Sequence, residues 1–336
     1  AIEHLRAAKP TDLFELSADR FHQLWSSSAA LRTWCAAQTP RAELVHLLLQ
    51  LLAGLLEAPT ALARETTLHE ERSLYSRIVV KKIDDLICLQ FNVRSEQRNQ
   101  SCMDSRNPDH MVFSYVRMSM TALLFQPEPR NILVVGLGGG TLPTAFRQLF
   151  PEAVIDIVEI DPAVVKVAED YFDFTADEQM QVYSQDARVW TKRAQNRARR
   201  YDLIILDAFN GEYIPEHLMT KEYLQETREL LAPAGTLIAN TFALSELYHH
   251  ESATYASVFG DFIDFKIPQS GNRVVIVPGV EVSDEQLQRR AADLKSRLRP
   301  YRVEIGSFAR LIIKQRRSPP RWQSDARVLT DQYSPA

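Results

Sequence analysis

Short apolar runs alternate with longer amphipathic stretches through the middle of the chain. The runs are rich in β-branched residues and leucine, which predicts strands buried on both faces. They lie at Ile132–Val135, Val154–Glu159, Met180–Tyr183, Leu203–Leu206 and Thr236–Thr241. The stretches between them predict helices at Thr141–Phe150, Pro162–Tyr171, Ala187–Arg199 and Lys221–Leu231. This alternation predicts an α/β fold: a doubly wound, Rossmann-like, mostly parallel sheet covered by helices on both faces.

Other patterns flank this core. Ser76–Ile83 and Asp85–Phe91 predict a small β hairpin that turns at Asp84-Asp85, and Met111–Leu124 predicts one helix before the first core strand. Phe262–Ile267 and Arg273–Val277 are close enough in sequence to form an antiparallel pair.

Four segments follow from these patterns. They are an N-terminal helical module (1–66), a β-hairpin subdomain (67–110), a nucleoside-binding catalytic domain (111–280), and a C-terminal helix and tail (281–336). Ser283 begins a capping-box sequence, which predicts the start of the C-terminal helix. The final VLTDQYSP regains apolar and aromatic character, so we expect it to pack back on the body.

Composition excludes several classes of protein. A net charge of −4 over 336 residues gives no reason to expect nucleic acid as a partner. The most apolar stretch, Leu44–Leu56, is shorter than the roughly 20 residues of a membrane span, so we expect no integral membrane segment and assign it to a core or subunit interface. Three cysteines without metal spacing predict a cytoplasmic protein with no metal site and no disulfide framework.

A glycine-rich turn follows the first core strand. Gly136, Gly138, Gly139 and Gly140 precede a predicted helix, whose N-terminus directs free N–H groups at whatever binds there. Glu159 ends the next strand about twenty residues on, where an acid commonly accepts hydrogen bonds from a ribose. The pattern therefore predicts an adenosine-type ligand.

Two more acids stand at strand ends. Asp186 follows the third predicted strand and Asp207 ends the fourth. Ligands in such sheets bind at the carboxyl ends of the strands, so both side chains are candidates for the same site. His217, in the loop after Asp207, is interpreted as a packed or helix-capping residue.

Over Ser73–Val277 the sequence resembles the methyltransferase fold that binds S-adenosylmethionine (AdoMet), and more closely the spermidine synthase (polyamine aminopropyltransferase) family. The resemblance rests on SLYSRIVV, the Gln100-Ser101 pair, FSY at 113–115, VVGLGGGTL, VEIDP, QDA at 185–187 and LDAF at 206–209. GLGGG, DAF followed by IPEHLMT, and LTDQYSP near the end are similar to a divergent bacterial branch of that family. The resemblance implies transfer of an aminopropyl group from decarboxylated AdoMet to an amine, without a metal, by a homodimer.

The resemblance also implies roles for donor-binding residues. Gly136, Gly138 and Gly140 would hold the amino-acid-derived arm of the donor. Glu159 would accept from the ribose hydroxyls. Asp186, with Ala187 beside it, would accept from the adenine amino group, and Gln100 would line the nucleoside site.

At the amine end, Asp207 is the implied base that frees the lone pair of the attacking amine, and Tyr115 orients that amine. Tyr75, Glu212 and Tyr213 are the implied substrate-binding residues.

The chain departs from the family pattern at three places. The glycine turn carries no aspartate. Val116 and Arg117 follow Tyr115 where the family places a glutamate two residues on, and a cation there would repel a diamine. Asn210 stands where a second loop aspartate is usual, with Glu212 two residues later as a replacement. Two alternatives therefore stay open: an AdoMet-dependent N-methyltransferase and a non-catalytic nucleoside-binding homologue.

Overall fold

The computed structural model describes residues 65–93, 96–210, 213–268, 270–318, 322–323 and 325–333, and it does not describe the side chains of 92–93 and 96–98. All of these residues belong to Arg64–Ala336, the larger of two compact units. Residues 1–64, which hold nearly all of the predicted helical module and its Leu44–Leu56 segment, and Glu212 lie outside the described residues. Residues 65–66, predicted as the end of that module, are instead the start of strand β1 Glu65–Arg72.

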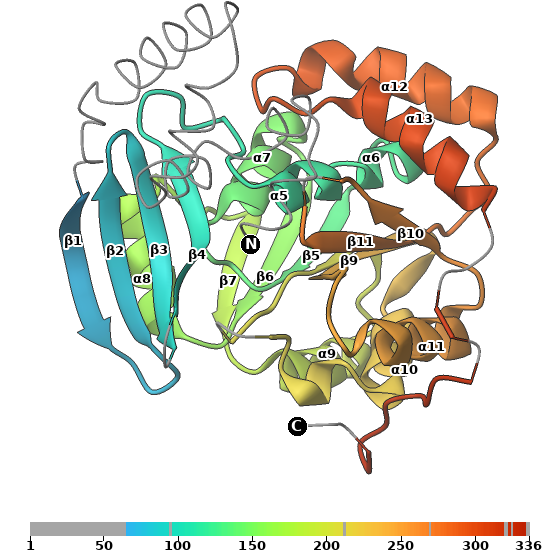
Figure 1. The fold of residues 1–336 in the computed structure, drawn as a ribbon, viewed down its shortest axis with the longest axis horizontal. Helices are drawn as coiled ribbons and strands as arrows, with labels where there is room; N and C mark the ends of the chain where they lie inside the picture. The colour runs from blue at the N-terminus through green and yellow to red at the C-terminus, as the bar shows by residue number, and fades with distance from the viewer. Residues whose placement is uncertain are drawn as a thin grey trace, which may run out of the picture. The chain divides into compact units, whose positions relative to one another are not determined.

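A seven-stranded, mostly parallel sheet forms the centre of this unit (Figure 1). Its strand order is β10-β11-β9-β8-β5-β6-β7. Strands β5 to β9 run parallel, and β11 pairs antiparallel with both β9 and β10. The bounds are β5 Asn131–Val135, β6 Val154–Glu159, β7 Met180–Ser184, β8 Tyr201–Leu206, β9 Leu231–Phe242, β10 Ile263–Lys266 and β11 Asn272–Val277. The predicted doubly wound sheet and its antiparallel pair are confirmed.

The chain order reverses direction at the centre of this sheet. From β5 it proceeds through β6 and β7 to one edge, and then returns to β8 on the other side of β5. In open α/β sheets a crevice forms at such a switch point, beyond the carboxyl ends of the strands. The topology therefore locates the ligand site between the ends of β5 and β8.

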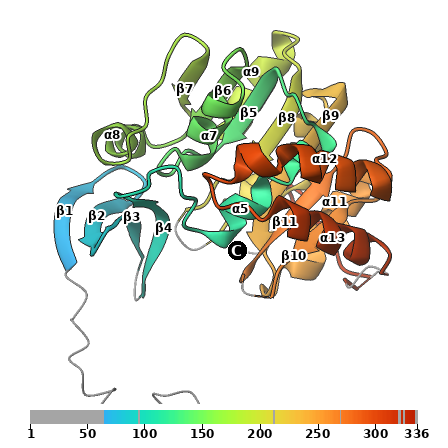
Figure 2. The same cartoon turned by 90° about the horizontal axis from the view of Figure 1, so that it is seen from above.

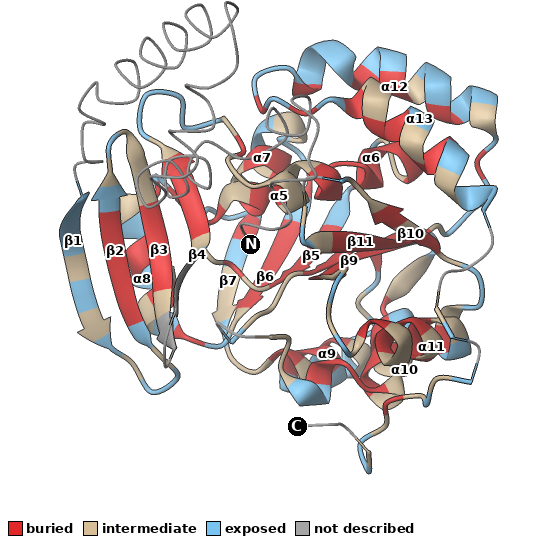
Figure 3. Cartoon of the chain, viewed as in Figure 1, coloured by how far each residue is buried: buried red, intermediate tan, exposed pale blue. Residues whose placement is uncertain are grey.

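Helices cover both faces of the sheet, and each face has its own apolar core (Figures 1 and 2). On one face pack α5 Ser114–Ser119, α6 Ala122–Phe125, α7 Thr141–Leu149, α12 Asp284–Leu298 and α13 Ile305–Arg316. On the other pack α9 Ala187–Asn196, α10 Lys221–Arg228 and α11 Tyr248–Phe259. Figure 3 colours buried residues red, and most residues of the central strands β5 and β8 are buried, which explains their largely apolar sequences.

A separate four-stranded antiparallel sheet precedes this core, in place of a lone hairpin. It comprises β1 Glu65–Arg72, β2 Arg77–Ile83, β3 Leu86–Val93 and β4 Glu96–Asp104. The predicted hairpin is β2–β3. Its apolar face, including Ile78 and Leu89, packs on Val164 and Val167 of α8 Pro162–Tyr171.

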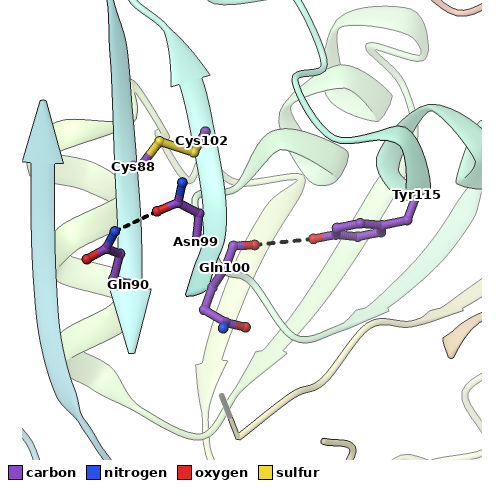
Figure 4. The surroundings of a disulfide bond; sticks show 6 residues. All are labelled: Cys88, Gln90, Asn99, Gln100, Cys102 and Tyr115. Atoms are coloured by element: carbon purple, nitrogen blue, oxygen red, sulfur yellow. Dashed lines mark hydrogen bonds between the residues drawn. A yellow bond between two sulfur atoms is a disulfide. The ribbon is translucent and has the colours of Figure 1, made fainter. Parts of the chain in front are cut away.

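One cysteine pair corrects the sequence analysis. Cys88 of β3 and Cys102 of β4 are direct cross-strand partners with Cα atoms 4.1 Å apart, and they form a disulfide (Figure 4). The expectation of no disulfide is therefore wrong. β4 was not among the predicted strands, so the β3–β4 register that brings the two thiols together could not be predicted.

Two further expectations can be compared with the structure. The single helix predicted over 111–124 is wrong, because α5 and α6 are two short helices separated at Met120 and Thr121. The C-terminal segment does pack back: Leu329 is fully buried, and the Arg188 side chain of α9 donates to both Asp331 carboxylate oxygens at 2.7 Å. No helix among the described residues is long and apolar enough to cross a membrane.

Candidate active site

A cavity of about 470 Å³ opens at the switch point of the large sheet. Its walls are the residues that follow β5, β6, β7 and β8, with β4 and α5 closing one side. Nine of the predicted site residues line it: Tyr75, Gln100, Tyr115, Gly136, Gly138, Glu159, Asp186, Ala187 and Asp207.

The glycine turn forms the floor where β5 passes into α7. Gly136 has φ +96°, and a Cβ there would lie 2.3 Å from the carbonyl oxygen of Asp207, so only glycine fits between β5 and β8. Gly140 has φ +75° and does not line the cavity; a Cβ there would meet the Phe174 ring at 2.5 Å. Gly140 therefore shapes the turn, whereas Gly136 and Gly138 face the ligand space.

Glu159 lies at the end of β6, facing the cavity. One carboxylate oxygen accepts from Leu137 N–H and the other from Asp161 N–H, each at 3.0 Å. Burial raises the pKa of Glu159, and these backbone hydrogen bonds act against that rise by stabilising the charged form. Glu159 thus ties the glycine turn to the start of α8 and presents its remaining lone pairs to a ligand.

Asp186 caps α9 at the end of β7. Its Oδ1 accepts from Val189 N–H at 2.9 Å, and its Oδ2 lies 2.7 Å from His217 Nε2. Ala187 lines the cavity beside it, as does His217 itself. The interpretation of His217 as a packed or helix-capping residue is therefore wrong.

Asp207 lies at the end of β8 on the opposite side of the cavity. Asp207 is half-buried, and burial raises its pKa to about 7, although a hydrogen bond from Asn240 opposes the rise. Asn240 Nδ2 donates to Asp207 Oδ1 at 2.8 Å, and Asn272 Nδ2 donates to Asn240 Oδ1 at 2.9 Å. A carboxyl with a pKa near neutrality, held in one orientation, is suited to accept a proton.

Tyr115 extends from α5 toward β4 (Figure 4). Its hydroxyl donates to the Gln100 carbonyl oxygen at 3.4 Å. Burial and the negative charge of Asp207 hold the pKa of Tyr115 well above its usual value, so its hydroxyl keeps its proton at neutral pH. Tyr75, in the turn before β2, is 54% exposed and lines the mouth of the cavity.

Arg117 turns away from the cavity. It does not line it, and its guanidinium donates to the Met111 carbonyl at 2.5 Å and the Val112 carbonyl at 2.9 Å. The expected repulsion between Arg117 and a diamine therefore does not apply.

Two loop residues after Asp207 differ in position. Asn210 lines the cavity. Tyr213 does not line it, because its hydroxyl is directed at Ser245 (2.6 Å) and Glu251 (2.8 Å).

Some residues of the cavity wall near Asp207 were not identified from the sequence. Asn240, Asn272 and Phe242 line the cavity from β9 and β11, next to Asp207. Asn240 is a polar residue near the end of an apolar strand, which is the pattern that identified Asp207, and it could have been found on the same ground. Asn272 begins β11, the antiparallel strand between β9 and β10, and no local pattern marks it.

The chain is similar to known proteins over most of its length. Residues 112–277 match the spermine/spermidine synthase domain. The polyamine aminopropyltransferase of Vibrio vulnificus (strain CMCP6) is 48% identical over 295 residues, which are 87% of this chain and 97% of that protein. The chain belongs to the spermidine synthase (polyamine aminopropyltransferase) family.

Two more distant matches are a second polyamine aminopropyltransferase and a solved structure. The polyamine aminopropyltransferase of Chromobacterium violaceum is 29% identical over 65% of this chain and 84% of that protein. The crystal structure of a probable spermidine synthase from Corynebacterium glutamicum superposes with a TM-score of 0.59 at 20% identity, covering 79% of this chain and 97% of that one. The latter shows a shared fold.

The matched spermidine synthase domain contains most of the cavity. It includes the glycine turn, Glu159, Asp186, Asp207 and the β9–β11 wall, whereas the wall from β2 to β4 lies outside it.

Proposed function

We propose that this member of the spermidine synthase family transfers an aminopropyl group from decarboxylated AdoMet to a small amine and releases methylthioadenosine. The charge of the cavity carries this proposal. Four carboxylates line it (Glu159, Asp161, Asp186 and Asp207), and no lysine or arginine stands among its described lining residues. Such a cavity favours a cationic donor and a cationic acceptor.

The same charge distinguishes the two candidate donors. AdoMet carries a carboxylate, which the four carboxylates of the cavity repel and no lysine or arginine among the described lining residues neutralises. Decarboxylated AdoMet carries a sulfonium and an ammonium and lacks that carboxylate. The cavity therefore favours the decarboxylated donor, and with it aminopropyl transfer over the methyltransferase alternative.

One end of the cavity binds the donor nucleoside, and the other binds and deprotonates the amine. Glu159 accepts from the ribose hydroxyls and Asp186 from the adenine amino group, which places the sulfonium near the glycine turn. Asp207 lies across β5 from them, where the amine enters, and Tyr115 stands beside it. The family match over nearly the whole length of the Vibrio vulnificus protein supports this arrangement over a non-catalytic role.

The chemical step balances with these groups. The amine is an ammonium near neutral pH, and its proton passes to the Asp207 carboxylate. The freed nitrogen lone pair attacks the aminopropyl methylene carbon bonded to sulfur, a C–N bond forms, and the bond between sulfur and that carbon breaks. Its electron pair stays on sulfur, which becomes the neutral thioether of methylthioadenosine. Positioning of nitrogen, carbon and sulfur in line supplies much of the rate.

Mass spectrometry tests the proposal. Full-length protein is incubated with an amine panel and either decarboxylated AdoMet or AdoMet. We expect methylthioadenosine, together with one amine whose mass has increased by an aminopropyl group, from the decarboxylated donor alone. Release of S-adenosylhomocysteine from AdoMet, or no product from either donor, would contradict the proposal.

A further inference from the structure

The predicted adenine acceptor, Asp186, has both of its oxygens engaged. Oδ1 accepts from the backbone N–H of Val189, and Oδ2 lies 2.7 Å from Nε2 of His217. A carboxylate held by one contact can rotate about its last torsion, because that torsion has a broad, shallow profile. Two contacts from different elements hold the carboxylate plane in one orientation.

His217 is itself placed by the fold. It lies in a single turn of 3₁₀-helix, η2 Glu216–Leu218, closed by Leu218 N–H donating to the Pro215 carbonyl at 2.9 Å. The Leu218 side chain is buried in the core between the sheet and α9–α11. The imidazole therefore extends toward Asp186 from a turn fixed by its neighbour.

A second anchor holds the start of the same segment. The Tyr213 hydroxyl donates to Glu251 at 2.8 Å, and Glu251 lies 3.1 Å from the fully buried guanidinium of Arg273. A hydrogen bond to a carboxylate is stronger than one between two neutral groups, and the Arg273 ion pair fixes that carboxylate in place. His217 thus stands on a segment fixed at Tyr213 and at Leu218.

We propose that His217 is a positioning residue that sets the purine specificity of the donor site. It fixes Asp186 so that the free lone pair of the carboxylate faces position 6 of the base. A 6-amino group donates to that lone pair, whereas a 6-oxo group presents an acceptor to an acceptor. This inference rests on the proposed function, because it takes Asp186 as the adenine partner.

The physical consequence is asymmetric. Without the imidazole, Asp186 loses one of two constraints and binds the 6-amino group less well. The same freedom lets the carboxylate turn away from a 6-oxo group and relieves the repulsion. Loss of His217 is therefore expected to weaken binding of the adenine nucleoside. It is also expected to reduce the ratio of the affinity for the adenine nucleoside to the affinity for the 6-oxo nucleoside.

Calorimetric titration with 5′-methylthioadenosine and 5′-methylthioinosine measures both effects. For the parent we expect a preference of tenfold or more for methylthioadenosine. His217→Ala should lower the methylthioadenosine affinity about three- to tenfold, the range for one hydrogen bond, and should lower the methylthioinosine affinity less. His249→Ala is the matched control, since His249 lies on α11 and contacts Gln323 outside the cavity.

Two conservative variants separate positioning from a general structural role. The side-chain amide nitrogen of His217→Gln reaches about as far as imidazole Nε2, whereas that of His217→Asn falls short. We expect the Gln variant to restore the adenine preference and the Asn variant to leave it narrowed, with unchanged melting temperatures.

The results that overturn the inference are distinct. If the parent binds methylthioadenosine and His217→Ala binds both nucleosides with the same affinities as the parent, the role of His217 is contradicted and the proposed function is not. Equal failure of the Gln and Asn variants, with lowered melting temperatures, would assign His217 to stability and overturn it as well. A parent that binds neither nucleoside would contradict the proposed function and this inference together.

Discussion

At the nucleoside end of the cavity, carboxylates accept hydrogen bonds from backbone N–H groups, whereas at the amine end the carboxylate depends on a side chain from another strand. Glu159 and Asp186 each accept from N–H groups two or three residues along the chain, and Glu159 also accepts from the glycine turn. Asp207 accepts from Asn240, which is 33 residues away and is held in turn by Asn272.

This difference has a chemical meaning. A carboxylate that accepts backbone N–H groups has its charged form stabilised, which suits a group that holds a ligand through hydrogen bonds. A buried carboxyl with one side-chain donor has a pKa near 7, which suits a group that exchanges a proton. Under the proposed function, donor binding and proton transfer therefore lie on opposite sides of β5.

The largest effect is expected at the amine end. Asp207→Asn removes the proton acceptor and keeps the shape and the ability to pair with Asn240, so kcat should fall about 10²–10⁴-fold. Methylthioadenosine release under saturating substrates measures it. Asp261→Asn is the control, an exposed aspartate after α11, and should keep full activity. A kcat within threefold of the parent would remove Asp207 from the chemistry.

A smaller effect is expected at the nucleoside end. Glu159→Gln replaces an acceptor-only group, which weakens hydrogen bonds from the ribose and from two backbone N–H groups. Donor KM should rise about 10–100-fold, as expected for the loss of hydrogen bonds to a charged acceptor. Initial rates over a range of donor concentrations measure it, with Glu169→Gln on the exposed side of α8 as control. A drop in kcat with an unchanged KM would contradict the assignment.

The pH profile tests the proton-accepting end directly. Burial raises the pKa of Asp207 to about 7, and the base acts in its deprotonated form. The value of kcat/KM should therefore rise with pH up to about 7 and then level off where the amine's own ionisation does not add to it.

Asn240→Ala sharpens that test. The hydrogen bond from Asn240 stabilises the charged carboxylate, so its loss should move the rise in kcat/KM to higher pH by about one pH unit. Rate measurements between pH 5 and 9 would show the change. A shift to lower pH, or none, would mean that the rise in kcat/KM reports the ionisation of a group other than Asp207.

The smallest effect is expected at Asn272. Asn272 donates to Asn240 and not to Asp207. Asn272→Ala should therefore move the rise in kcat/KM to higher pH, but by less than Asn240→Ala does. Parallel pH profiles of the two variants would show the order. A larger shift for Asn272→Ala would contradict the chain of hydrogen bonds.

The same division explains what could be predicted from the sequence. The glycine turn, Glu159 and Asp186 form one local pattern of strand, turn, helix and strand end, so the sequence order itself brings them together. The amine end depends on β9 and β11 reaching Asp207 through the packing of the whole sheet, and Asn240 and Asn272 were missed for that reason. The disulfide was missed because it depends on the register of a strand that was not predicted.

Other predictions stay open for a physical reason. Glu212 and residues 1–64 lie outside the described residues. The homodimer and the cytoplasmic location depend on surroundings that one chain does not contain. Asn210 lines the cavity after Asp207, so under the proposed function we expect its replacement of a second acid to bear on the choice of acceptor.

The most direct test of the division is equilibrium binding of methylthioadenosine to the two carboxylate variants, measured by calorimetry. The account predicts that Asp207→Asn binds the nucleoside as the parent does, although it turns over poorly, and that Glu159→Gln loses at least tenfold in affinity. Weakened binding by Asp207→Asn together with parent-like binding by Glu159→Gln would contradict it.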